Sequence, residues 1–162
     1  RRVAGGLFER TAVRVAANAA LTRFGDRAAE ALFLRALGAK RDEVRGIAHE
    51  CAPWTKSLVV TAALRERLPD ADAIVALGRI GDCASADCFE ATAREPANDR
   101  DVRTDAVWSL AAVRGSAASP LLERLAVVDG DAVVQEAATR ALALMGVETV
   151  SQPVAETSRQ AP

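Results

Sequence analysis

The hydrophobic residues of this chain recur at the spacing of one helix face, and the whole pattern returns roughly every thirty residues. Within each copy, apolar side chains stand at offsets 0, 3 or 4, 7 or 8, and 11. Residues at these offsets share one face of an α-helix. Successive copies begin 31, 25, 33 and 32 residues apart, which suits one helical hairpin per copy. The copies start at Val13, Val44, Pro69, Val102 and Val134, and the second is interrupted by Pro53.

A second set of helices is expected between these amphipathic ones, at residues 27–39, 57–68, 85–94 and 119–128. Gly at offset 12 or 13 stands where a helix end favours a residue that tolerates positive φ. Ser119 followed by Pro120 predicts an N-cap with Pro in the first turn. We therefore expect an all-α chain folded as an α-solenoid, a superhelix of about five helical hairpins over residues 1–146. Residues 147–162 lose the periodicity and are expected to form a flexible tail.

Composition narrows the picture further. The net charge of −1 gives no general attraction to nucleic acid or to anionic lipid, which needs clustered Lys and Arg. No apolar run approaches the length of a membrane-spanning helix, and no secretory signal follows Arg1 and Arg2. The three cysteines, Cys51, Cys83 and Cys88, cannot all pair within the chain. We expect reduced thiols and a cytoplasmic location, and, because no Met begins the sequence, a piece of a longer protein.

A family resemblance rests on the run from Ala73 to Asp82 and on Asp101-Val102-Arg103 with Ala106 and Leu110. These segments resemble the HEAT-like repeats first described in phycobilisome lyases, and the resemblance covers roughly residues 10–146. It implies stacked helical hairpins and is more specific for fold than for function. Two alternatives stay open: a subunit or relative of the phycobilin lyases, and a nucleic-acid-binding module similar to the alkylpurine DNA glycosylases. The latter needs a basic concave surface, which 21 Lys and Arg against 22 Asp and Glu do not supply.

Residues that could carry chemistry form no recognisable catalytic or metal site, and we predict no catalytic residue, metal ion or cofactor. His49-Glu50 is similar to the His-Glu pairs by which deoxyhypusine hydroxylase holds two irons on repeats of this kind. One pair cannot build a two-metal site, so we interpret His49 as an ordinary solvent-facing residue. Cys83 and Cys88 lack the further ligands that a zinc site needs, and we expect both to pack against neighbours.

Arginines recur at offset 1 of three copies, as Arg14, Arg45 and Arg103. They can form an anion-binding row, or they can pair with acidic residues of neighbouring units such as Asp42, Asp101 or Asp131. We favour pairing between layers, because compensated charges do not attract a ligand from a distance.

The first helix set is expected to line a concave surface with the residues at offsets 2, 5, 6, 9 and 10. Both tryptophans of the chain fall there, although Trp54 could instead fill a gap beside Pro53. Exposed apolar clusters that include Trp and Arg are typical of interaction sites. We therefore predict a non-catalytic scaffold that binds a partner peptide or helix, with a possible homodimer through an exposed end at Leu7-Phe8 or at Leu142-Met145. The predicted contact residues are Trp54, Ile74, Val75, Arg79, Val107 and Trp108.

Overall fold

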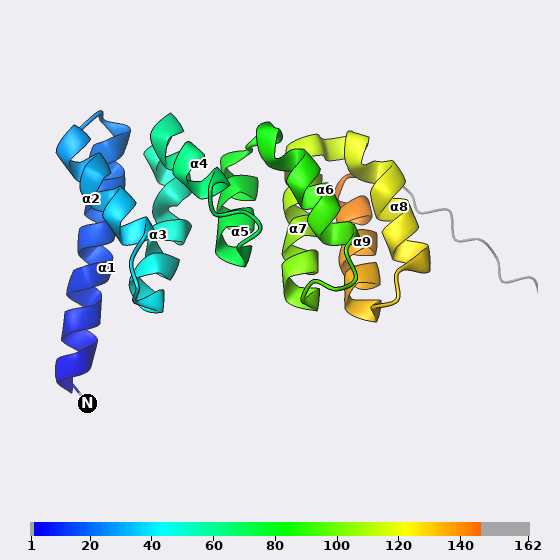
Figure 1. Ribbon diagram of the computed structural model, residues 1–162, viewed down its shortest axis with the longest axis horizontal. Helices are drawn as coiled ribbons and strands as arrows, with labels where there is room; N and C mark the ends of the chain where they lie inside the picture. The colour runs from blue at the N-terminus through cyan, green and yellow to red at the C-terminus, as the bar shows by residue number, and fades with distance from the viewer. Residues whose placement is uncertain (1, 147–162) are drawn as a thin grey trace, which may run out of the picture.

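The computed structural model describes residues 2–146, with side chains from Arg10 onward, and this part of the chain is helical without any strand (Figure 1). The predicted tail, residues 147–162, lies outside the described residues, as do the side chains of Leu7 and Phe8. Two short 3-10 helices, η1 (Cys83–Ser85) and η2 (Gly115–Ala118), precede α6 and α8. The α-helices are α1 (Arg2–Arg23), α2 (Arg27–Leu37), α3 (Asp42–Thr55), α4 (Leu58–Arg65), α5 (Ala71–Ile80), α6 (Ala86–Arg94), α7 (Arg100–Arg114), α8 (Ser119–Val128) and α9 (Ala132–Leu144).

The helices form two layers, which confirms the predicted all-α solenoid. We call α1, α3, α5, α7 and α9 the B helices, because each packs beside the next along the molecule (Figure 1). The A helices α2, α4, α6 and α8 each pack on the B helix that follows, whereas contacts from one A helix to the next are sparse. The B layer is therefore the continuous part of the solenoid. None of the helices between residues 2 and 146 is both long and apolar enough to cross a membrane.

Helix ends follow local chemistry at most of the predicted positions. The Asp70 side chain accepts hydrogen bonds from the backbone amides of Asp72 and Ala73 and begins α5. Gly81, at φ 79°, ends the same helix in the left-handed conformation that other residues rarely adopt. The Ser119 prediction is wrong: η2 leads directly into α8, so Ser119 has helical dihedrals and its hydroxyl caps nothing.

Two of the B helices differ from their predicted limits. α1 begins at Arg2, well before the expected start at Val13. Pro53 does not interrupt the second copy, because α3 continues through it to Thr55 and ends at Lys56 in a left-handed conformation. A proline inside a helix removes one backbone hydrogen bond but need not stop the helix when tertiary contacts hold both sides. Here Ala52 and Thr55, on either side of Pro53, are both buried.

The core lies between the two layers and between neighbouring B helices. Phe33 and Phe89 of the A layer are fully buried, and many of the remaining interior positions are Ala. Such small residues let helices approach closely. At the crossing of α5 and α7, a Cβ on Gly78 would lie 2.5–2.9 Å from Ser109 atoms. The Ser109 hydroxyl donates a 3.1 Å hydrogen bond to the Ile74 carbonyl across this contact.

Ion pairs tie successive units, as predicted for one of the three offset-1 arginines. The buried Arg103 guanidinium donates to the carboxylate of Asp129, and its Nε donates to the Ala93 carbonyl at 3.1 Å. Arg65, at the end of α4, also forms an ion pair with the next unit, with Asp82 just after α5. Arg45 instead pairs with Asp42 of its own helix at 2.7 Å, and the exposed Arg14 has no ion-pair partner among the described side chains. These three arginines therefore do not form a continuous row.

Candidate binding surface

Two shallow depressions open on the face of the B helices that points away from the A layer. We call this surface the B face. The first depression lies between α1 and α3 and the second between α5 and α7, and no A-helix residue lines either one. Each contains one of the two tryptophans of the chain.

The first depression, of about 650 Å³, is mainly apolar. The side chains of Val13 and Trp54 border it and are 67% and 55% exposed. Its floor includes Ile47 and the buried Cys51. Burial raises the pKa of the Cys51 thiol, assisted by the charge of Glu50, so this cysteine is a poor nucleophile at neutral pH. The depression can therefore bury an apolar side chain of a partner.

The second depression, of about 290 Å³, is smaller and more polar. Small residues form its floor, namely Gly78, Ser109 and Ala112, while Trp108, Arg79 and Asp105 stand around it. No hydrogen bond or ion pair joins Arg79 to Asp105 in the part of the chain that the structure describes. Burial, followed by the nearby charges of Asp101 and Asp72, raises the pKa of Asp105, and Arg79 opposes this only in part.

The predicted contact residues divide into two groups. Trp54, Val75, Arg79 and Trp108 line the depressions. Ile74 and Val107 are fully buried, so their assignment to the exposed face was wrong. Both stand at offset 5, where a B helix inside the solenoid is covered by the next B helix as well as by its A partner. An inner B helix packs on the preceding B helix, on the following B helix and on an A helix. More of its circumference is therefore buried than the one apolar face that the sequence periodicity indicated.

His49 also lies elsewhere than expected. It is 4% exposed and packs between α3 and α5. Its Nδ1 lies 2.9 Å from the Arg45 carbonyl and 3.9 Å from the Asp72 carboxylate, while Nε2 is buried without a hydrogen-bond partner. Burial lowers the pKa of His49, against the raising effects of the Arg45 carbonyl and Asp72. The neutral ring therefore donates from Nδ1, and the solvent-facing interpretation was wrong.

The cysteines do not form a site. All three are free thiols. Cys88 is half-buried, but Cys83 is exposed, so packing does not account for it as predicted. Its Sγ lies 3.5 Å from the Val113 carbonyl. Among residues 2–146, no three His, Cys, Asp or Glu side chains are grouped closely enough to hold a metal ion.

Sequence reasoning selected none of the carboxylates of this face as contact residues. Glu43 and Glu50 line the first depression and Asp105 the second, and none has an ion-pair or hydrogen-bond partner among the described side chains. Only Asp105 had a signal in the sequence, an uneven distribution of charge, because Glu43 and Glu50 lie in the basic part of the chain. Residues 1–68 hold 13 Lys and Arg against 7 Asp and Glu, whereas residues 69–162 hold 8 against 15. The overall charge of −1 concealed this difference.

Two layers of helices with a continuous B layer define an α-solenoid, and comparison with known families refines this class. Residues 70–143 match the family model of HEAT repeats. This segment, which contains α5 to α9 apart from the last residue of α9, is therefore similar to HEAT repeats, which supports the resemblance to HEAT-like repeats there. The match is to HEAT repeats in general and does not select the lyase group. No curated protein matches the chain significantly.

Proposed function

We propose that this chain is a non-catalytic scaffold that binds a helix or peptide of a protein partner on the B face. The observation that carries the proposal is the pair of depressions, each between consecutive B helices and each bordered by a tryptophan. Tryptophan supplies much of the binding energy in many protein interfaces, because its large apolar surface is buried at little entropic cost. Repeat proteins of this architecture commonly bind extended partners along a stacked face.

The spacing of the depressions sets the length of the bound segment. Their centres are two B-helix spacings apart, roughly 16–20 Å for packed helices at 8–10 Å each. A helix covers this distance in about eleven to thirteen residues, because each residue adds about 1.5 Å. We therefore expect two anchor side chains about eleven to thirteen residues apart in a helical partner. A cytoplasmic location is part of the proposal and is supported by the three free thiols.

The test is a selection of binders from a displayed library of random peptides of about sixteen residues, with the chain immobilised. Each enriched peptide is then titrated against the wild type and against Trp54→Ala and Trp108→Ala. The matched control is Leu58→Ala, which removes an 85% exposed apolar side chain from the A layer. Because the chain has two Trp and no Tyr, its fluorescence reports directly on the two depressions.

The expected result is a set of peptides whose affinity falls at least roughly tenfold in one tryptophan variant and is unchanged in the Leu58 variant. Their binding should also shift the tryptophan emission. Peptides that bind all variants equally would place the binding surface away from the B face. Circular dichroism of each variant verifies that the helices are retained.

A further inference from the structure

We infer that the segment bound on the B face is basic as well as amphipathic, with an Arg or Lys side chain seated between Trp108 and Asp105. This inference rests on the proposed function and adds the chemistry of the partner. It follows from the charged groups around the two depressions and from the absence of partners for them among the described side chains.

The first depression has acidic edges around an apolar floor. Among the described residues, the charged ones that line it are Glu43 and Glu50, and both are exposed on α3. They stand seven residues apart, two helical turns, and therefore lie on the same side of α3. A partner that buries an apolar side chain against Trp54 brings its own flanking polar residues close to these two carboxylates. Basic residues at those flanking positions would be attracted, and acidic ones would be repelled.

The second depression offers a more specific seat. Asp105 is half-buried beside the half-buried indole of Trp108, one helical turn along α7. The carboxylates of Asp101 and Asp72 are near enough to raise its pKa further after burial has done so. A guanidinium group suits this arrangement, because it can stack on an indole face while it donates paired hydrogen bonds to a carboxylate. Its arrival would neutralise a carboxylate that now lacks a partner.

Arg79 is the exception on this face and supplies an internal control. It lines the same depression as Asp105 and has no ion-pair partner in the described part of the chain. A basic partner is repelled by Arg79 and attracted by Asp105. Removal of the two charges must therefore have opposite effects on binding. A neutral partner would respond little to either change.

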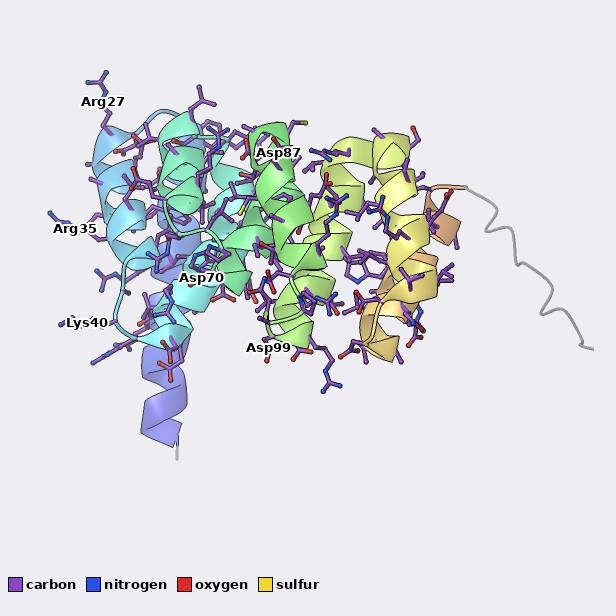
Figure 2. The ribbon with its side chains drawn as sticks, turned by 45° about the vertical axis from the view of Figure 1, so that its right-hand side comes forward. Arg27, Arg35, Lys40, Asp70, Asp87 and Asp99 are labelled. Atoms are coloured by element: carbon purple, nitrogen blue, oxygen red, sulfur yellow. The ribbon has the colours of Figure 1, made fainter. Side chains whose placement is uncertain are left out.

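Three basic side chains of α2 and the loop that follows it lie away from the two depressions. Figure 2 shows Arg27, Arg35 and Lys40 projecting outward from the N-terminal end, on α2 and the loop that follows it. None of them lines a depression on the B face. They leave Glu43, Glu50 and Asp105 uncompensated among the described side chains.

The experiment uses the same random peptide library and divides the enriched peptides by their dependence on Trp54 and Trp108. The tryptophan-dependent peptides should carry a net positive charge, and salt should weaken their binding. For a synthetic copy of one such peptide, Asp105→Asn should weaken binding roughly fivefold to tenfold. Arg79→Gln should tighten it by roughly twofold to fivefold.

The outcomes distinguish failure of the inference that the partner is basic from failure of the proposed scaffold function. Tryptophan-dependent peptides that are neutral or acidic, or that respond alike to Asp105→Asn and Arg79→Gln, would overturn the inference and leave the proposed function intact. Failure to enrich any tryptophan-dependent peptide would overturn both. The two variants differ from the wild type by one surface charge each, and equal thermal unfolding of the three proteins shows that a change in affinity does not come from a change in fold.

Discussion

Arg103 shows how single buried charges hold the repeats in register. Its side chain lies on α7 but bonds the end of the preceding A helix at Ala93 and the loop before the next B helix at Asp129. The side chains of Arg103 and Asp129 are 5% and 7% exposed. Burial raises the pKa of Asp129, but the hydrogen bonds from Arg103 and the Asp131 amide outweigh it and hold the pKa below the usual value. The carboxylate therefore stays charged and depends on its partner.

We predict that Arg103→Met destabilises the chain by about 3–5 kcal/mol, because it leaves the Asp129 charge buried and unpaired. The free energy of unfolding in urea measures the loss. Arg103→Met combined with Asp129→Asn should recover much of the stability, since the uncompensated charge is then gone while the Asp131 amide keeps an acceptor. The surface pair of Arg140 and Glu136, whose side chains are 68% and 60% exposed, is the control. Arg140→Met should cost less than about 1 kcal/mol, and equal losses in the two arginine variants would contradict the argument.

His49 makes stability depend on pH in a defined direction. Burial lowers its pKa below 6.5, and the nearby charged groups are Asp72, Asp70 and Arg67. The unfolded chain therefore binds the proton more readily than the folded one. The contribution of the neutral His49 to stability is fully present above pH 6.5 and is lost as the pH falls through the pKa of His49 in the folded chain. The reason is that a protonated Nε2 would be a buried donor without an acceptor.

We expect the free energy of unfolding to fall between pH 6.5 and 5 with a slope of at most about 1.4 kcal/mol per pH unit, the value for one proton. Chemical denaturation at a series of pH values measures it. His49→Gln should remove this slope. Asp82 and Asp129, whose pKa values are lowered by their arginine partners, lose their contribution only below about pH 4 and so do not overlap. A slope that persists in His49→Gln would assign the effect to another group.

The local sequence pattern predicted which segments are helical better than it predicted which side of each helix is buried. Period, caps and turn glycines are local features, and so the alternating helices and their order were predicted from the sequence. Which side of a B helix is covered depends on neighbours roughly thirty residues away. That is why Ile74 and Val107 were assigned to the surface although both are buried, whereas Trp54 and Trp108 do line the depressions. The buried position of His49 was missed for the same reason, because α5 covers it.

The close approach of α5 and α7 depends on one residue. A methyl group on Gly78 would meet Ser109 Oγ, Cβ and Cα at 2.5, 2.7 and 2.9 Å, and the Cα is backbone that cannot rotate away. We predict that Gly78→Ala destabilises the chain by about 1–3 kcal/mol through overpacking of α5 on α7. Gly46→Ala is the matched control, because a methyl group added at this position of α3 would have no neighbouring atom within 4 Å. It should be neutral or stabilising by up to about 1 kcal/mol. Similar melting temperatures for both variants would show that α5 and α7 have room to move apart.

Across the chain as a whole, charge is separated along the solenoid axis. Excess Lys and Arg lie in the part that contains α1 to α4, and excess Asp and Glu in the part from α5 onward. The basic side chains of α2 and the following loop project outward, as Figure 2 shows. Copies of a molecule with a net charge near zero repel one another little. The attraction between the basic part of one copy and the acidic part of another is therefore not opposed.

We predict from this separation that copies of the chain attract one another at low ionic strength. At about 10 mM salt the screening length is roughly 30 Å, comparable with a small domain, whereas at about 150 mM it is about 8 Å and the attraction should vanish. Static light scattering measures it as a negative second virial coefficient that rises with salt. Arg27→Gln, Arg35→Gln and Lys40→Gln together should weaken the attraction, because they remove three exposed cations of the basic region. Arg79→Gln with Arg124→Gln, which removes cations from the acidic region, should not weaken it.

Association that persists or strengthens in high salt would instead indicate apolar contacts, for which the 85% exposed Phe24 and the 80% exposed Leu144 are the first residues to change. Within the predicted exposed segment Leu142-Met145, Leu142 is buried and Met145 half-buried, so that Leu144 is the exposed apolar residue there.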